Sequence, residues 1–110
     1  MTIEKTSIPD DEDPTLTANA LKAMAHPLRW KILCTLGNQE LSVSEIVKNI
    51  GTSQSNISQH LEQLRNKNIL ISRKEANRIY YKIRTGKILE LIGTMRTVLC
   101  PANLDDRYDR

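Results

Sequence analysis

Two short helix patterns separated by only three residues constrain the fold of this 110-residue chain more than any other feature. Ser42 and Glu45 are spaced as in a capping box, where the serine hydroxyl accepts one backbone N–H and the glutamate carboxylate accepts another. This signal predicts a helix over 43–50, which Gly51 ends. The next helix is predicted over 54–67, where isoleucine and leucine repeat at helical spacing. Two short helices joined by such a glycine turn are typical of a helix-turn-helix.

Further elements are predicted on both sides of this pair. Prolines at the first helical position start helices over 14–25 and 27–36. Downstream, 69–74 alternates as a strand, and a second strand follows whose predicted inward face comprises Ile79, Tyr81 and Ile83. A last helix is predicted over 86–99, with an apolar arc too wide for packing on one side only. The expected fold is mainly α with a small β-hairpin, a winged helix-turn-helix in the order α-α-α-α-β-β-α.

A single domain spanning 14–100 is expected between two tails. Residues 1–13 are polar, acidic and aperiodic, which predicts a disordered tail, and 101–110 form a C-terminal tail. The tails carry net charges of −4 and −1, so the domain carries +8 although the whole chain carries only +3. A basic domain of this kind favours a polyanionic partner such as nucleic acid, although a solvated basic surface is the simpler alternative.

The sequence argues against several classes of protein. Its longest apolar run has three residues, whereas a membrane-spanning helix needs about 20, so no membrane partner is expected. The acidic N-terminus lacks the apolar stretch of a signal peptide. We therefore expect a cytoplasmic protein whose cysteines are thiols. Because no catalytic triad pattern, phosphate loop or metal-ligand cluster is apparent, we expect neither an enzyme nor a cofactor.

Short polar side chains make the outward face of the 54–67 helix the candidate DNA-reading surface. A helix in the major groove touches base edges with residues near its N-terminus, and side-chain amides can pair with adenine. The candidates on this helix are Gln54, Ser55, Asn56, Ser58, Gln59 and His60. The predicted hairpin adds cations that could hold phosphates, namely Arg73, Lys74 and Arg78. The alternatives are an ordinary solvated face and, for His60, a metal ligand or a pH switch, whereas His26 is expected to cap a helix start.

Three stretches of the chain resemble the ArsR/SmtB family. They are Ala-His-Pro-Leu-Arg at 25–29, Leu-Ser-Val-Ser-Glu-Ile at 41–46 and Ser-Gln-Ser-Asn-Ile-Ser-Gln-His-Leu at 53–61. The resemblance covers roughly residues 15–100 and implies a homodimeric winged-helix repressor that dimerises through its first and last helices. The metal-binding positions of the family do not carry ligands here. Ser42 and Ser44 stand where the arsenic and lead type has cysteines, and the last helix has one carboxylate and no histidine.

The two cysteines are similar in position to those of the BigR/HlyU/SqrR branch of that family. Cys34 falls in the predicted 27–36 helix and Cys100 at the end of the last helix. This similarity implies sensing of persulfides, polysulfides or oxidants through a cross-link within one subunit. We therefore expect a DNA-binding repressor whose operator binding depends on the state of these cysteines. The alternative is a regulator that responds to a metal, to a small organic ligand or to no inducer, with cysteines that only pack in the core.

Overall fold

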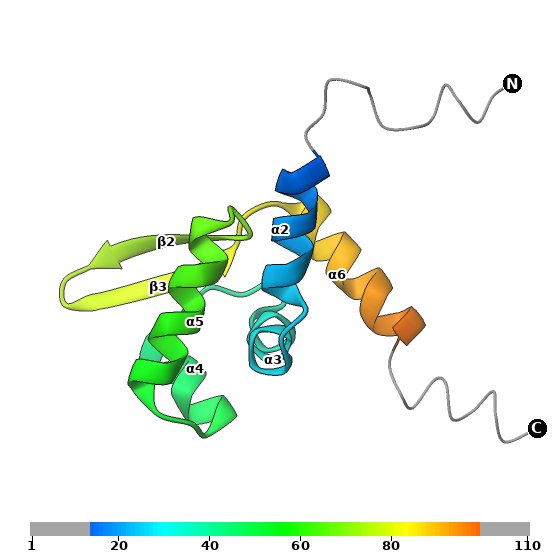
Figure 1. Ribbon diagram of the computed structural model, residues 1–110. Coiled ribbons are helices and arrows are strands. Elements are labelled where there is room, and N and C mark those ends of the chain that lie inside the picture. The colour runs from blue at the N-terminus through cyan, green and yellow to red at the C-terminus, as the bar shows by residue number, and fades with distance from the viewer. Residues whose placement is uncertain (1–13, 100–110) are drawn as a thin grey trace, which may run out of the picture.

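Five helices and a three-stranded sheet make up residues 14–99, which are the residues that the computed structural model describes (Figure 1). The helices are α2 (Pro14–Met24), α3 (Pro27–Leu36), α4 (Val43–Ile50), α5 (Gln54–Asn66) and α6 (Gly86–Leu99). The strands are β1 (Leu41–Ser42), β2 (Leu70–Glu75) and β3 (Arg78–Ile83). Every element predicted from the sequence is present, with ends within one residue of those predicted. Both predicted tails and Cys100 lie outside the described residues.

Local caps explain where the helices begin and end. His26 precedes α3, and its Nδ1 accepts a hydrogen bond from the backbone N–H of Leu28 at 3.1 Å, which confirms the predicted cap. At α4 both halves of the capping box are formed, because Ser42 Oγ accepts from Glu45 N–H and Ser42 N–H donates to the Glu45 carboxylate. Gly51 ends α4 at a φ of 89°, a left-handed conformation that glycine adopts without steric cost.

The sheet contains one strand that the sequence analysis did not predict. Its order is β1-β3-β2 with antiparallel pairing, and Leu41 of β1 lies opposite Tyr81 of β3. β1 has only two residues, so it carries no alternating pattern from which a strand could be recognised. This strand ties the segment before α4 to the wing, which is the hairpin of β2 and β3.

The core lies where α3, α4 and α5 meet the base of the sheet. Ile32, Leu36, Ile46, Ile57 and Leu61 have no exposed surface, and the same cluster includes residues from all three strands or the segments beside them. The prediction that Ile79 points into this core was wrong. Tyr81 and Ile83 are buried, but Ile79 is 42% exposed because it pairs with Lys74 next to the turn of the hairpin. The tip of the wing extends beyond the helices that cover the base of the sheet (Figure 1).

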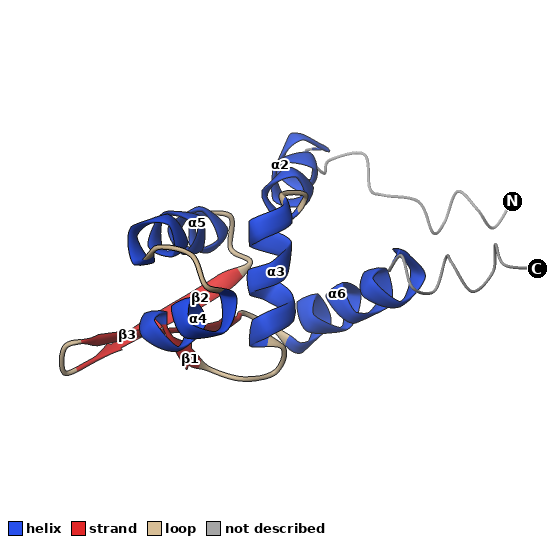
Figure 2. Cartoon of the chain, turned by 90° about the horizontal axis from the view of Figure 1, so that it is seen from below, coloured by secondary structure: helices blue, strands red, loops and turns tan. Residues whose placement is uncertain are grey.

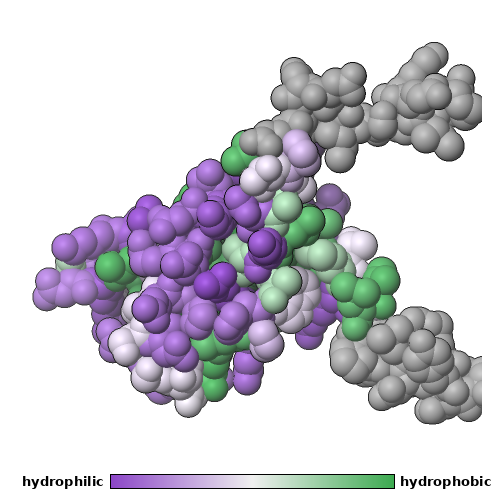
Figure 3. Space-filling model, in the orientation of Figure 1, coloured by the Kyte–Doolittle hydropathy of each residue, from purple (hydrophilic) through white to green (hydrophobic). Residues whose placement is uncertain are grey.

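Figures 1 and 2 show two ends of the molecule on either side of α3. The wing and the α4–α5 pair lie at one end, and α2 and α6 lie toward the other. Hydrophilic side chains cover the wing and α5, whereas hydrophobic ones gather near α2 and α6 (Figure 3). Within residues 14–99, none of the helices has the length and apolarity that crossing a bilayer requires.

Candidate nucleic-acid interface

The outward face of α5 forms a polar groove. Ile57, Leu61 and Leu64 are buried on the opposite side of the helix, which fixes its rotation about its own axis. The groove is lined by Gln54, Ser55, Asn56, Ser58, Gln59, Glu62 and Gln63. Five of the six residues predicted on this helix therefore lie together. The groove thus presents amide and hydroxyl groups beside one carboxylate.

The N-terminal turn of α5, which would approach the bases first, is held by its own side chains. Ser53 Oγ accepts a hydrogen bond from the Asn56 backbone N–H at 3.2 Å, so it caps the helix. The Asn56 amide donates to Thr52 Oγ1 at 3.3 Å and is half-buried. Gln54, Ser55 and Gln59 are exposed. The exposed side chains are therefore those best placed to reach a base edge.

His60, the sixth predicted residue, lies apart from the groove and contacts α3. Its Nδ1 accepts a hydrogen bond from Arg29 Nε at 3.0 Å, and its ring lies 4.6 Å from the ring of His26. Because Nδ1 is an acceptor, the imidazole is neutral with its proton on Nε2. Burial lowers the pKa of His60 below 6.5, and the nearby charges of His26 and Arg29 lower it further. Arg29 also donates to the carbonyl of Ala23 at 3.4 Å, so it joins α5 to the end of α2.

The predicted wing cations differ in their surroundings. Lys74 and Arg78 are exposed beside the turn that joins β2 to β3. Arg73 is also exposed, but its guanidinium contacts two carboxylates. Nε and Nη2 each donate to Glu40 at 2.8 Å, and Nη1 donates to Glu75 at 2.6 Å. The same guanidinium lies over the Tyr80 ring, 4.7 Å from its centre.

Glu62 connects α5 to the wing, and the sequence analysis did not single it out. Its carboxylate accepts a hydrogen bond from the Tyr81 hydroxyl at 2.8 Å and two from Arg65 at 2.7 and 3.1 Å. Burial and this hydrogen bond to Glu62 together raise the pKa of Tyr81 to about 12. An i,i+3 pair of Glu62 and Arg65 was visible in the sequence, but the tyrosine partner comes from another element, 19 residues away.

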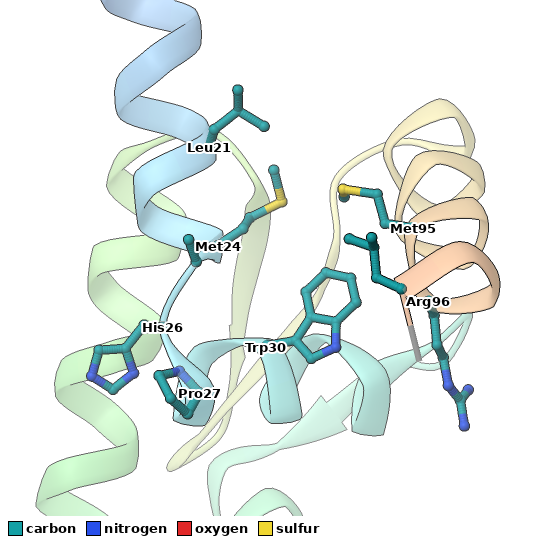
Figure 4. Close-up of a pocket in the computed structure, with 9 residues that line it drawn as sticks. Leu21, Met24, His26, Pro27, Trp30, Met95 and Arg96 are labelled. Carbon is teal, nitrogen blue, oxygen red and sulfur yellow. The ribbon is translucent and has the colours of Figure 1, made fainter. Parts of the chain in front are cut away.

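Cys34 lies near the C-terminal end of α3, the helix that runs from Pro27 to Leu36. It is half-buried and follows Trp30 by four residues, so the two side chains share a face of the helix. Trp30 lines a pocket of about 580 Å³ between α2, α3 and α6, and Leu99 lines the same pocket. In Figure 4, Met24 and Met95 point toward one another across this pocket, and the Trp30 ring lies between α3 and α6. Cys34 is therefore close in the helix to a pocket that the end of α6 also lines.

Metal-ligating side chains do not gather in the described part of the chain. Among residues 14–99, no three His, Cys, Asp or Glu side chains lie together as a possible metal site. Ser42 and Ser44 instead bond to each other through their hydroxyls at 3.2 Å.

Comparison with known proteins decides the family of this chain. Residues 26–72 match the family model described as bacterial regulatory protein, arsR family. The transcriptional activator HlyU of Vibrio cholerae is 40% identical over 83 residues, which cover 76% of this chain and 77% of HlyU. This chain belongs to the ArsR family. As an ArsR-family member it is a DNA-binding transcriptional regulator, and its placement near BigR and HlyU is confirmed.

Other members of the ArsR family share both sequence and fold with it. The biofilm growth-associated repressor of Xylella fastidiosa is 36% identical over 83 residues, 76% of this chain and 73% of that protein. The crystal structure of the repressor BigR from Xylella fastidiosa matches with a TM-score of 0.73 and 33% identity, over 91% of this chain and 98% of BigR. Reduced HlyU of Vibrio cholerae matches with a TM-score of 0.72 and 33% identity, over 91% of this chain and 99% of HlyU.

A third relative is described as a homodimer. The homodimeric winged helix-turn-helix domain of a possible ArsR-family regulator from Mycobacterium bovis matches with a TM-score of 0.74 and 25% identity. That match covers 83% of this chain and 89% of the Mycobacterium bovis domain. The winged helix-turn-helix fold predicted for this chain is therefore confirmed.

Proposed function

We propose that this regulator represses transcription by binding its operator as a homodimer, and that chemical change at Cys34 and Cys100 switches the binding. The observation that carries the DNA contact is the groove on α5, which presents exposed amides and a hydroxyl beside a basic wing. Gln54, Ser55 and Gln59 would read base edges, with Asn56 and Ser58 behind them. Lys74 and Arg78 would hold phosphates. Such a repressor works where the DNA is, which makes the cytoplasm its expected compartment.

Exposed apolar side chains on α2 and α6 support the homodimer. Leu16, Leu91, Val98 and Leu99 are between 46% and 69% exposed, although residues of this type are usually covered. Leu91 and Val98 are seven residues apart and so lie on one face of α6. A second copy of the chain would cover this face, and one relative is described as homodimeric.

The proximity of Cys34 to the α6 side of the molecule supports the thiol switch. Trp30, four residues before Cys34 in α3, and Leu99 at the end of α6 line one pocket. Cys100 directly follows α6 in the chain. Two thiols can lose two hydrogens to an oxidant such as peroxide and form a disulfide. Alternatively, they can react with two molecules of glutathione persulfide to form a trisulfide bridge, with release of two molecules of glutathione and one of hydrogen sulfide. Either bridge would tie α3 to the end of α6, which is also part of the proposed dimer surface. The relative HlyU is known in a form named reduced.

DNA-binding titrations test the reading surface directly. Purified protein would select a duplex from a random library, and anisotropy would then measure Kd over a range of salt concentrations. We expect Gln59→Ala to weaken binding to the selected duplex by about 5- to 100-fold, as for the loss of one base contact, with little change on random DNA. Lys74→Gln should weaken binding to both the selected duplex and random DNA, and it should reduce the slope of log Kd against log salt concentration by about 0.9. Glu90→Gln, an exposed change on α6, is the control. Equal binding by Gln59→Ala and the unmodified protein would contradict this reading surface.

The same titration tests the switch when the protein is first treated with glutathione persulfide or peroxide. We expect treated protein to lose at least tenfold in affinity, with a mass change that matches the added sulfur or the lost hydrogens. The Cys34→Ser and Cys100→Ser variants should keep their affinity. Trp30, the one tryptophan of the chain, should report the bridge through its fluorescence. If the double serine variant still released DNA after treatment, the proposed cysteine switch would be wrong. If neither treatment changed the unmodified protein, the inducer would instead be a metal, a small organic ligand or another non-thiol signal.

A further inference from the structure

We propose that Arg73 positions the wing and does not itself contact DNA. A basic side chain on a wing is expected to hold phosphate, and the sequence analysis expected that role for Arg73. The structure instead places its guanidinium between two carboxylates, with Glu40 on one edge and Glu75 on the other. We call Arg73, Glu40 and Glu75 the wing clamp. This inference rests on the DNA-binding surface proposed above and adds to it the residue that sets the angle of the wing.

The hydrogen bonds of the clamp use every nitrogen of the guanidinium. Nε and Nη2 form a bidentate pair with Glu40, the geometry in which arginine and carboxylate bind most specifically. Nη1 donates to Glu75 on the same strand, two residues away. Three of the five N–H donors of Arg73 are therefore engaged, one on each nitrogen, and a phosphate would have to share the guanidinium with both carboxylates.

Glu40 makes the clamp a connection between separate parts of the fold. It directly precedes β1 and lies 33 residues before Arg73 in the chain. The pair therefore ties β2 to the segment that leads into the helix-turn-helix. Tyr80 of β3 packs under the same guanidinium, so that both strands of the wing contribute to the clamp.

A second connection holds the opposite face of the wing. Successive residues of a strand point to opposite faces, so Tyr80 and Tyr81 of β3 contact different neighbours. Tyr80 contacts the clamp, whereas Tyr81 donates to Glu62 of α5. The wing is therefore held from both sides, and its angle relative to α5 is set before DNA arrives.

The charges of the clamp also disfavour a phosphate at Arg73. One guanidinium and two carboxylates carry a net charge of −1. The hydrogen bond from Arg73 is the main cause that lowers the pKa of Glu40, so this carboxylate is ionised at neutral pH. A phosphate at this point would meet the negative charge of Glu40 and Glu75 at close range. Lys74 and Arg78, for which no such pair is found among the described residues, carry the positive charge that DNA would meet.

A double-mutant cycle on Glu40 and Arg73 tests the clamp, because the two roles predict opposite signs for Glu40→Gln. If Arg73 contacted phosphate, Glu40→Gln would release it and remove a repulsive charge, and binding would tighten. For the clamp, we expect Glu40→Gln and Arg73→Gln each to weaken binding to the selected duplex by about 2- to 5-fold, the range of an exposed ion pair. The variant with both changes should bind the selected duplex no more weakly than Arg73→Gln alone, because the second change removes a partner that is already lost.

Salt dependence gives an independent readout. Arg73→Gln should leave the slope of log Kd against log salt unchanged, whereas Lys74→Gln should reduce it by about 0.9. Thermal unfolding should shift by only a few degrees, as for the loss of an exposed ion pair, so all variants stay folded during the titration. Tighter binding by Glu40→Gln, or a reduced slope for Arg73→Gln, would overturn the proposal. Failure of the unmodified protein to bind any selected duplex would instead contradict the DNA surface itself.

Discussion

At the scale of single residues, partners far apart in the chain decide what a polar side chain does. His60 belongs to the polar pattern of α5, yet its nearest polar partner is Arg29, 31 residues earlier. Arg73 belongs to the basic wing, yet its partner Glu40 is 33 residues earlier. Helical periodicity predicts which face a residue occupies, but it contains no information on contacts over such separations.

The contact of His60 with Arg29 predicts a pH-dependent stability. The pKa of His60 in the folded chain lies below its ordinary value of 6.5. The contribution of neutral His60 to the free energy of unfolding is therefore complete above pH 6.5, and it is lost as the pH falls through the folded-state pKa of His60. We expect the free energy of unfolding to fall between pH 7.5 and 5.5, by about 1 kcal/mol for one partly exposed hydrogen bond to a charged group.

Urea unfolding at several pH values measures this effect. His60→Gln keeps an acceptor for Arg29 but does not titrate, so it should reduce the acid dependence. The chain has only two histidines, so a variant with both His26→Asn and His60→Gln contains no imidazole. Asparagine is a good helix cap, which preserves the start of α3. An identical acid dependence in the unmodified protein and the His60→Gln variant would exclude His60 as its source.

At the scale of helices and strands, local signals were sufficient to predict each of the helices within residues 14–99. Pro27, the Ser42–Glu45 box and Gly51 each mark a boundary through backbone chemistry that acts within a few residues. β1 could not be predicted because two residues have no period, and it exists only through pairing with β3. Ile79 was misplaced because the alternation of a strand does not reveal where the covering helices end.

The capping box of α4 predicts a measurable contribution to stability. Ser42 is only 2% exposed, and its hydroxyl accepts the Glu45 N–H. Ser42→Ala should lower the free energy of unfolding by about 1 kcal/mol, as the loss of a serine cap typically does. Ser44→Ala is the matched control, because Ser44 is exposed and its hydroxyl contacts the Ser42 hydroxyl without capping the helix. Equal losses in the two variants, measured by urea titration, would argue against a capping role.

At the scale of the whole molecule, the end with α5 and the wing and the end with α2 and α6 have surfaces of different chemistry. α5 and the wing present polar and basic groups, whereas α2 and α6 present exposed apolar ones. The wide apolar arc of the last helix was visible in the sequence and predicted a second covering surface. The identity of that surface depends on another chain, so no pattern within one chain can specify it.

The apolar surface of α6 predicts the oligomeric state. We expect the unmodified protein to sediment as a dimer and Leu91→Glu to sediment as a monomer, since a charge cannot be buried there unpaired. The monomer should bind a two-half-site duplex at least tenfold more weakly. Ile71→Glu is the control for sedimentation, because Ile71 is 43% exposed, close to the 46% of Leu91, but belongs to the wing and not to α6. A dimer that survived Leu91→Glu would place the interface elsewhere.

The separation of these two ends has an evolutionary consequence. The residues that line the groove on α5 and those that line the pocket between α2 and α6 are two distinct sets. A duplicated gene can therefore acquire a new inducer through changes at one end while its product still recognises the ancestral operator. His26 is the instructive exception, because it lines the pocket and also contacts His60 of α5. A replacement of His26 would change the pocket and also the packing of α5, the helix that carries the groove, so we expect this position to tolerate fewer replacements than its neighbours.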